Sequence, residues 1–320
     1  MKFMTKLFLF LLIIQIVTDI HASTTMSDIE SNAIGIVEQR SSDSMAYLGQ
    51  KVPDTVPEVF APGIISKSEE YEFGSVLSIN TDEFFYGVVR GSRSEILYTK
   101  LHGGVWSDAE IVLSHDIYSF NDPMLSPDEN QLFFISDMPL RGKGKKKDSD
   151  IWYIERTKDG WGEPINIGSP INSERNEYYI SFAENGTMYF ASNSQAELSE
   201  TYNFDIYKSE LISNKFRTPV KLPKPINTSK YEADAFIAFD ESYIIFSALR
   251  KDGYGRGDLY ISFRTSNGGW SKAKNMGEAI NNKHHQLCPF VDRDNKFLFF
   301  TSNRNIYWVN AEIIDLYREH

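Results

Sequence analysis

The stretch "DIWYIERTKDGW" at residues 150–161 decides the fold because it recurs along the chain. An acidic residue, a short apolar strand, a turn and an aromatic residue return as "DIYKSELISNKF" at 205–216 and "DLYISFRTSNGGW" at 258–270. A more divergent copy, "EILYTKLHGGVW", occupies 95–106. The acidic residues are 53 to 55 positions apart, and a constant period of this length predicts a repeat architecture.

Each repeat is predicted to hold about four short strands. An apolar strand such as "MYFAS" (188–192) precedes each copy, and a tail such as "INIGSPINS" (165–173) follows three of them. Gly, Asn and Asp separate the strands and accept the positive φ angles of hairpin turns. Because four-stranded antiparallel units stack radially in propellers, we predict an all-β propeller of five blades. Six blades are the alternative if residues 23–57 hide a degenerate unit.

The two ends of the repeat region predict how the ring closes. "NIYWV" at 305–309 is followed by neither the Trp nor the tail, whereas "VFAPGIIS" at 59–66 resembles a tail. We therefore expect the strand at 59–66 to complete the last blade, which removes the open sheet edges. The predicted propeller spans 58–320, with repeats at about 70–119, 120–174, 175–229, 230–283 and 284–310.

The N-terminus has the pattern of a secretory signal. Lys2 and Lys6 precede the apolar run Leu7 to Val17, and Ala22 offers a small residue for cleavage. This run is shorter than the ~20 residues of a membrane span, so no stable transmembrane segment is expected. We predict a signal peptide at 1–22, a linker at 23–57, and a periplasmic or extracellular location.

Charge and cysteine content narrow the possible functions. The net charge is −11, and loss of Lys2, Lys6 and Asp19 with the signal would make it −12. An acidic chain does not favour nucleic acid as a partner. Cys288 is the single cysteine, which excludes an intramolecular disulfide and metal sites built on cysteine clusters. No hydrolase or nucleotide-binding motif is present, and we expect a monomer without a cofactor.

Three stretches resemble a known family: "SPDENQLFFIS" (126–136), "RGKGKKKDSDIWY" (141–153) and "DGWGEPINIGSPINS" (159–173). Over about 70–310 the chain resembles the TolB-type, WD-like β-propeller repeat family. The resemblance implies an exported propeller that serves as a binding or scaffolding module. The family's "SPDG" turn is intact nowhere, and Glu95 replaces the usual Asp, which makes the first blade the least certain.

Residues that recur in each blade indicate architecture, because a catalytic group is usually needed only once. We interpret Asp150, Asp205 and Asp258 as caps that accept hydrogen bonds from backbone N–H groups one or two residues further on. The aromatic residues after the turn are interpreted as blade-to-blade packing and not as sugar-stacking platforms. They include Trp106, Trp161 and Trp270.

The starts of the innermost strands are the first candidate site, since these strands line the central channel of a propeller. A ring of carboxylates with a histidine could bind a polar ligand or a divalent cation, while the alternative is a solvated acidic rim. The predicted ligand-binding residues are Glu72, Asp122, Glu177, Glu232 and His285.

The sequence "RGKGKKK" at 141–147 is the second candidate, a basic insertion in an acidic protein. It could contact anionic lipid heads, glycans or a protein partner, or it could be a solvated loop. The predicted surface-binding residues are Arg141, Lys143, Lys145, Lys146 and Lys147.

These observations favour an exported, non-enzymatic propeller that binds an envelope protein or polysaccharide through its variable loops. The alternative is a propeller glycoside hydrolase or lyase with Glu177, Glu232 and Asp234 as catalytic candidates. That mechanism needs two carboxyl groups ~5–5.5 Å apart for retention, or ~6.5–9.5 Å apart for inversion.

Overall fold

The computed structural model describes residues 47–195 and 202–318. The chain divides into two units, residues 1–50 and residues 51–320. The described part of the first unit contains the short 3-10 helix η1, Tyr47–Gly49. The predicted signal peptide (1–22) and residues 23–46 of the predicted linker lie outside the described residues. The second unit contains all the repeats together with the predicted closing strand.

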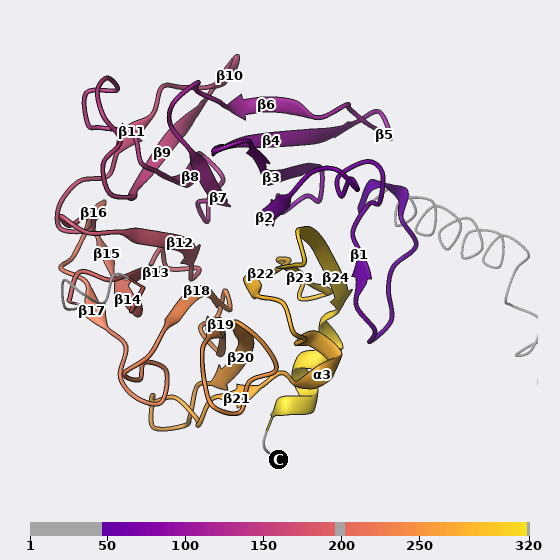
Figure 1. Cartoon of the computed structure of the whole chain (residues 1–320), viewed down its shortest axis with the longest axis vertical. Coiled ribbons are helices and arrows are strands. Elements are labelled where there is room, and N and C mark those ends of the chain that lie inside the picture. Colours follow the sequence, from indigo (N-terminus) through magenta and orange to yellow (C-terminus); the bar gives the residue numbers. More distant parts are fainter. Residues whose placement is uncertain (1–46, 196–201, 319–320) are drawn as a thin grey trace, which may run out of the picture. The chain divides into compact units, whose positions relative to one another are not determined.

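The repeats form five small antiparallel sheets arranged around a ring, as predicted (Figure 1). The first strand of each sheet lies innermost, and these five strands contact their neighbours around the axis. The innermost strands are β2 (Glu72–Leu77), β7 (Phe120–Leu125), β12 (Glu177–Phe182), β18 (Glu232–Ile237) and β22 (Gln286–Val291). The second strands are β3 (Glu83–Arg90), β8 (Gln131–Ser136), β13 (Met188–Ser192), β19 (Tyr243–Ala248) and β23 (Phe297–Ser302).

The third strands vary in length between blades, and the fourth strands are the shortest. The third strands are β4 (Arg93–His102), β9 (Asp150–Thr157), β14 (Asp205–Ser209), β20 (Asp258–Phe263) and β24 (Asn305–Asn310). The fourth strands of blades 1 to 4 are β6 (Glu110–Leu113), β11 (Ile165–Asn166), β17 (Val220–Lys221) and β21 (Lys274–Asn275). Short strands follow the third strand in three blades: β5 (Val105–Trp106), β10 (Gly160–Trp161), β15 (Leu211–Ile212) and β16 (Lys215–Phe216).

An N-terminal strand closes the ring, so the blade number is five and not six. Strand β1 (Glu58–Val59) pairs antiparallel with β24, and the backbone N–H of Phe60 donates to the Ile306 carbonyl at 2.8 Å. The phenyl ring of Phe60 is fully buried against Phe84, Phe299 and Trp308. The last blade therefore depends on the first strand of the propeller for its outer edge.

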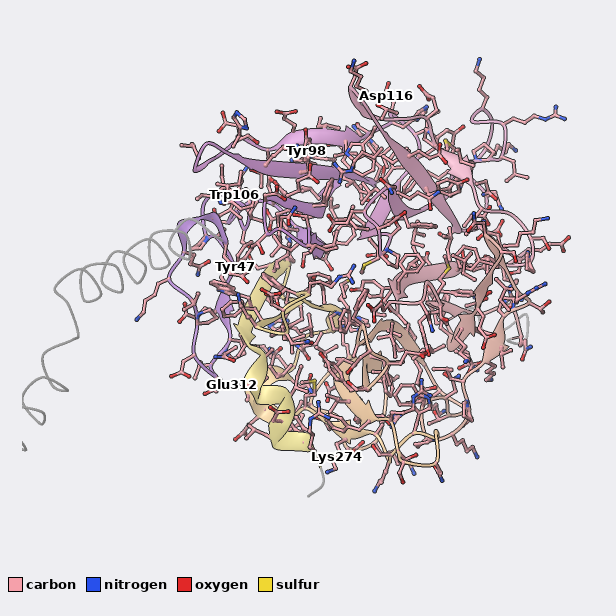
Figure 2. The ribbon with its side chains drawn as sticks, turned by 180° about the vertical axis from the view of Figure 1, so that it is seen from behind. Tyr47, Tyr98, Trp106, Asp116, Lys274 and Glu312 are labelled. Atoms are coloured by element: carbon pink, nitrogen blue, oxygen red, sulfur yellow. The ribbon has the colours of Figure 1, made fainter. Side chains whose placement is uncertain are left out.

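Two short helices lie near this closure. Helix α3 (Gly277–Ile280) is part of the tail of blade 4, and the 3-10 helix η2 (Ala311–Tyr317) ends the described chain. Lys274 donates to the Tyr317 carbonyl at 2.9 Å, and Figure 2 shows Lys274 beside the helix that carries Glu312. The C-terminal segment is thus held against blade 4. No helix in the described ranges has the length and apolar content needed to cross a membrane.

The tail asparagines fasten the outer edge of each blade. The side chain of Asn227 accepts from the backbone N–H of Ile206 and donates to its carbonyl, both at 2.8 Å. Asn172 and Asn281 make the same pair of bonds in their own blades. One side-chain amide therefore replaces a rung of the β-ladder, which explains why the tail repeats.

The repeated aspartates are structural, although their main partners differ from the prediction. Asp205 pairs with Lys221 Nζ at 2.6 Å, and Asp258 accepts from Asn275 Nδ2 at 2.8 Å. These partners lie on the fourth strand, whereas we predicted backbone N–H groups just after the aspartate. Asp258 does accept backbone bonds, but from the preceding residues Tyr254 and Gly255. The acidic residue thus joins the third strand to the fourth strand or the preceding loop.

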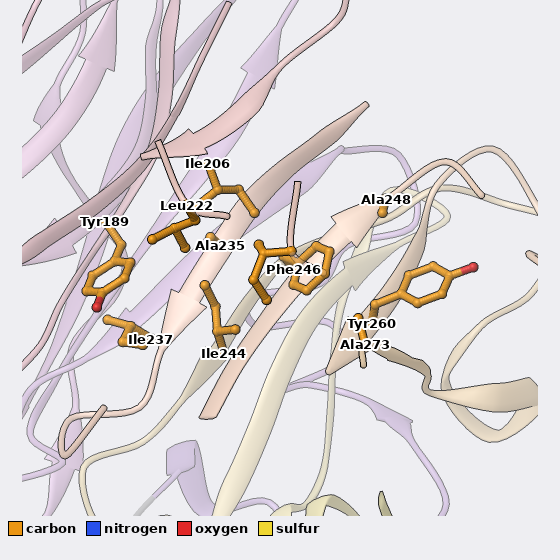
Figure 3. Close-up of a cluster of buried hydrophobic side chains, with 11 residues drawn as sticks. Tyr189, Ile206, Leu222, Ala235, Ile237, Ile244, Phe246, Ala248, Tyr260 and Ala273 are labelled. Carbon is orange, nitrogen blue, oxygen red and sulfur yellow. The ribbon is translucent and has the colours of Figure 1, made fainter. Parts of the chain in front are cut away.

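Apolar and aromatic side chains join neighbouring blades. Trp161 of blade 2 packs edge-on against Phe85 of blade 1, with 5.8 Å between ring centroids, in agreement with the predicted blade-to-blade role. A buried cluster between blades 3 and 4 is drawn in Figure 3; it includes Tyr189, Ile206, Ile237 and Phe246. Full burial of one such side chain contributes about 1.5–3 kcal/mol, so each blade depends on its neighbours.

Candidate functional site

The first residues of the innermost strands connect consecutive blades. Glu177 accepts from the backbone N–H and hydroxyl of Ser173 at 3.2 and 2.7 Å, and Glu232 accepts from both groups of Thr228 at 2.9 and 2.6 Å. Each partner belongs to the tail of the preceding blade. In the first blade Glu72 accepts from the Lys67 backbone N–H at 3.1 Å. All three glutamates are fully buried, so their carboxyl groups hold the blade junctions together.

The same position in blade 5 is occupied by Gln286. Its amide contacts Asn282 and donates to Ser302 Oγ at 2.9 Å. An uncharged amide therefore serves where blades 1, 3 and 4 carry a carboxyl group, while blade 2 has Phe120 at this position. Burial raises the pKa of Glu177 to about 7, and burial also raises the pKa of Glu72 and Glu232. The junction in blade 5 is thus made by hydrogen bonds without a negative charge, whereas Glu232 also lies 3.8 Å from the Arg250 guanidinium.

Asp122 and Asp234 lie two positions further along their strands than Glu177 and Glu232 do. The third residue of every innermost strand has a positive φ and coincides with a break in the ladder, a β-bulge. We call these residues the axial cluster; they are Gly74, Asp122, Tyr179, Asp234 and Cys288. The predicted ring of acidic residues is therefore divided in the structure. Glu72, Glu177 and Glu232 lie at the blade junctions, whereas Asp122 and Asp234 belong to the axial cluster.

The axial cluster is closely packed across blades. The Cys288 thiol donates to Asp122 Oδ1 at 3.5 Å, and the Tyr179 hydroxyl donates to the Pro289 carbonyl at 2.7 Å. A Cβ atom on Gly74 would lie 3.1 Å from Asp122 Oδ1, so glycine leaves room for that carboxyl group. Residues from four strands are thus joined near the ring axis.

At neutral pH the axial cluster combines one ionised carboxyl group, Asp122, with protonated Asp234 and Cys288. Burial raises the pKa of Asp122 to about 6, while burial and then the charge of Asp122 raise the pKa of Asp234 to about 8. Burial also raises the pKa of the Cys288 thiol well above its usual value. A protonated thiol is a poor nucleophile, so the cluster offers hydrogen bonds and shared protons. In the described part of the chain, no group of three His, Cys, Asp or Glu side chains is placed to hold a metal ion.

His285 lies one residue before β22, at the junction of blades 4 and 5. Its Nε2 atom is 3.2 Å from Ser247 Oγ, and its ring packs edge-on against Tyr231 with 5.9 Å between centroids. Burial lowers the pKa of this imidazole. A neutral, packed ring between two blades accounts for the residue without a ligand.

The basic stretch 141–147 belongs to the loop between β8 and β9. Lys146 pairs with Asp137 at 2.7 Å and Lys147 pairs with Asp150 at 2.6 Å, while Arg141, Lys143 and Lys145 are exposed to solvent. The five predicted residues therefore divide into two that fix the loop and three that face outward.

A groove of about 950 Å³ lies between blades 2 and 3 and was not predicted. Phe133 and Phe182 meet across the two blades at its floor, with ring centroids 4.9 Å apart. The β15–β16 hairpin contributes Leu211 and Phe216 to its edge. One feature of the sequence could have pointed to this groove. The stretch "SELISNKF" at 209–216 lacks the glycine that the turns of the other copies contain.

Two carboxylates at the groove have no ion-pair partner among the described residues. Glu155 on β9 and Glu184 after β12 are both exposed lining residues. Two cations also line the groove. The guanidinium of Arg156 binds both carboxylate oxygens of Glu83 at 3.1 and 2.7 Å, whereas Lys215 is exposed. The groove therefore combines an apolar floor with unpaired negative charge.

The channel is narrow at the end opposite to the strand starts. A cavity of about 60 Å³ there is lined by Phe182, Phe236 and Phe290. Arg293 of blade 5 lies over the Phe239 ring at 3.4 Å and donates to the Pro127 carbonyl of blade 2 at 2.8 Å. Neither this cavity nor the groove is lined by Glu177, Glu232 or Asp234, so the arrangement lends no support to the hydrolase alternative.

Comparison with known proteins gives structural neighbours only. No protein-family model matches the chain, and no curated protein sequence matches it. TolB from Acinetobacter baumannii is similar with a TM-score of 0.49 and 12% identity, over 76% of this chain and 55% of that one. A putative TolB from Agrobacterium tumefaciens has a TM-score of 0.48 and 14% identity, over 74% and 72%.

A protein of unknown function from Dyadobacter fermentans has a TM-score of 0.49 and 14% identity, covering 82% of this chain and 84% of that chain. The chain thus spans about half the length of the Acinetobacter protein and most of the other two. The chain is a five-bladed β-propeller, and its structural neighbours include TolB-type propeller proteins.

Proposed function

We propose that this chain is an exported, non-enzymatic propeller that binds an extended segment of a partner protein in the groove between blades 2 and 3. The observation that carries the proposal is the groove itself, with a volume of about 950 Å³. Binding pockets generally measure about 300–1,000 Å³, so this groove is large enough for several side chains. The repeated residues support the frame, and the groove edge in blade 3 includes the β15–β16 hairpin, whose turn lacks the glycine of the other copies.

The composition of the groove favours a segment that carries apolar and basic side chains. The rings of Phe133 and Phe182 offer an apolar floor, and Leu211 extends it along one edge. The carboxylates of Glu155 and Glu184 complement lysine or arginine. Arg156 is neutralised by Glu83, and the lining acids Asp128, Glu155 and Glu184 outnumber the remaining cation, Lys215. Complementary charges mainly provide specificity and faster association, while the buried apolar contacts provide affinity.

Export is part of the proposal, and the pattern of residues 1–22 supports it. In a periplasmic or extracellular setting the natural partner is an envelope protein. An envelope polysaccharide is the competing ligand. Its sugar rings would pack on the aromatic rings of the groove and its hydroxyl groups would donate to the carboxylates, whereas a basic peptide would also gain from opposite charge.

The test is a peptide selection on the purified chain, followed by binding measurements with variants. We expect selected peptides to be rich in basic and apolar residues, and Glu155→Lys combined with Glu184→Lys to weaken their binding at least tenfold. The control is Glu163→Lys combined with Asp159→Lys, at two exposed acidic positions outside the groove lining. Equal binding to both double variants would refute the groove proposal.

Two further experiments test the other predicted ligands, an envelope polysaccharide and a divalent cation. Saturable binding of an envelope polysaccharide, with no peptide selected, would replace the protein partner by a glycan. Repeating the selected-peptide titration with a chelator tests the predicted divalent cation near Glu72, Asp122, Glu177, Glu232 and His285. Unchanged peptide binding in the presence of the chelator would show that the groove binds peptides without a divalent cation.

A further inference from the structure

The loop between β8 and β9 has a defined structure. The Gly142 N–H donates to the Pro139 carbonyl at 2.7 Å, and the Lys147 N–H donates to the Asp137 carbonyl at 3.0 Å. From the neighbouring segment, the Tyr118 hydroxyl donates to the Gly144 carbonyl at 2.9 Å. These bonds fix both ends and the middle of the loop, so its side chains extend from an ordered backbone.

The cations of this loop fall into two classes. Lys146 pairs with Asp137, and Lys147 pairs with Asp150 and Asp148. The other three cations are exposed and have no ion-pair partner in the part of the chain that the structure describes. They are Arg141, Lys143 and Lys145. The protein has a net charge of −11, so three unpaired cations on one loop make a local positive patch on an otherwise acidic protein.

Exposed aliphatic side chains accompany these cations. Leu140, immediately before Arg141, is 66% exposed, and Ile117 in the segment that holds the loop is 51% exposed. Asp116 in the same segment is exposed and is labelled in Figure 2; it is the one opposing carboxylate there without an ion-pair partner among the described residues. The loop therefore joins a net positive charge to an apolar tip.

We propose that this loop docks the propeller on the surface of a membrane containing anionic phospholipids. Lysine and arginine are attracted to such a surface, each strengthening binding by about five-fold. A leucine beside them gains by entering the interface between head groups and acyl chains. A soluble anionic polymer would engage the cations but would leave Leu140 in water, so the pairing favours lipid.

The groove residues on β8 lie toward the end opposite to the loop. The groove lining approaches the loop at Asn166, which donates to the Asp150 carboxylate that Lys147 also binds. Gln131, the first residue of β8, lines the groove, whereas the loop begins after Ser136, the last residue of the strand. Six extended residues span roughly 20 Å. Docking through the loop therefore leaves the groove accessible, and the two proposals can fail independently.

The experiment measures binding of the full chain to vesicles of phosphatidylglycerol mixed with phosphatidylcholine, and to phosphatidylcholine alone. We expect tighter binding to the anionic vesicles and loss of that preference in high salt. The variant Arg141→Gln, Lys143→Gln, Lys145→Gln is expected to lose roughly 100-fold in affinity for the anionic vesicles.

The matched control is Lys158→Gln, Lys230→Gln, Lys283→Gln, which removes the same charge from other exposed positions. It should stay within threefold of the unmodified chain, and the apolar run at 7–17 is common to both variants. Equal loss in the two variants would overturn the proposal. It would also be overturned if Leu140→Ser bound anionic vesicles unchanged while soluble polyphosphate displaced the protein. Circular dichroism confirms folding of each variant.

Discussion

At the scale of single residues, Gln286 of blade 5 indicates which side-chain property is needed at the junctions between blades. Gln286 performs with an amide what Glu72, Glu177 and Glu232 perform with carboxyl groups. A buried carboxyl group that accepts bonds from a hydroxyl and an N–H can remain in place in the protonated form. Burial of an ionised carboxylate is energetically unfavourable at this position. The junction depends on the shape and hydrogen bonds of the side chain.

This comparison predicts the pH dependence of stability. Burial raises the pKa of Glu177 to about 7, above its usual value of 4.5, so the folded protein binds this proton more tightly than the unfolded chain does. The resulting stabilisation is complete below pH 4.5 and is lost as the pH rises through 7; it amounts to about 3 kcal/mol. Asp122 and Asp234 act in the same direction, because their pKa values are also raised.

We therefore expect Glu177→Gln to be close to the unmodified chain at pH 5 and more stable at pH 8, by about 1–3 kcal/mol. Urea unfolding at the two pH values measures the difference. Glu163→Gln, at an exposed position, serves as the control and should follow the unmodified chain. A destabilised Glu177→Gln at pH 8 would show that the ionised carboxylate is needed at the junction.

Asn227 provides a second prediction at this scale. Its side chain makes three hydrogen bonds, to both backbone groups of Ile206 and to the Leu222 carbonyl. Asn227→Ala leaves buried backbone groups without partners, so we expect a loss of about 3 kcal/mol of unfolding free energy. Chemical denaturation measures it, with the exposed Lys230→Ala as control. Equal stability of both variants would mean that the asparagine bonds are replaced by water.

At the scale of elements, the closing strand contributes more through one side chain than through its length. Strand β1 has two residues in the ladder, whereas Phe60 is fully buried against three aromatic rings. Phe60→Ala should lower the unfolding free energy by about 3–5 kcal/mol, because it leaves a cavity where the ring closes. The exposed Val56→Ala is the control, and thermal unfolding is the measurement. If both variants unfold alike, closure does not limit stability.

Element prediction from the sequence succeeded where local chemistry repeats. Turn residues, the tail asparagine and the acidic start of the third strand each have a partner within the same blade, about 16 to 21 residues away. Local partners of this kind leave a regular pattern in the sequence. The β15–β16 hairpin pairs Leu211 with Phe216, just as Leu101 pairs with Trp106 in blade 1. It was therefore part of the repeat, whereas the groove that its side chains border left no regular pattern.

At the scale of the whole molecule, the two proposed surfaces should act independently. The propeller is a rigid frame, and the groove residues on β8 lie toward the end of that strand opposite to the basic loop. We expect Arg141→Gln, Lys143→Gln, Lys145→Gln to leave peptide binding unchanged within twofold. Glu155→Lys combined with Glu184→Lys should likewise leave binding to neutral vesicles unchanged. Calorimetric titration and vesicle sedimentation measure the two effects, and a tenfold cross-effect would indicate that the surfaces are coupled.

The sequence by itself determined the propeller fold and its closure, because the repeat period and the incomplete last unit are both readable from the order of residues. It predicted five blades with six as the alternative, and the structure has five. It also identified acidic residues near the starts of the innermost strands. It could not assign their directions, since a bulge at the third residue of each strand changes the alternation of side chains between the two faces.

Only the tertiary structure decided which distant residues meet. Asp122 and Cys288 are 166 positions apart and touch near the axis, and Phe133 and Phe182 come from different blades to form the floor of the groove. Such contacts depend on how blades pack around the ring, and packing between repeats leaves no fixed spacing in the sequence. The frame is thus a property of the repeats, whereas the groove and the axial cluster arise where residues of different blades converge.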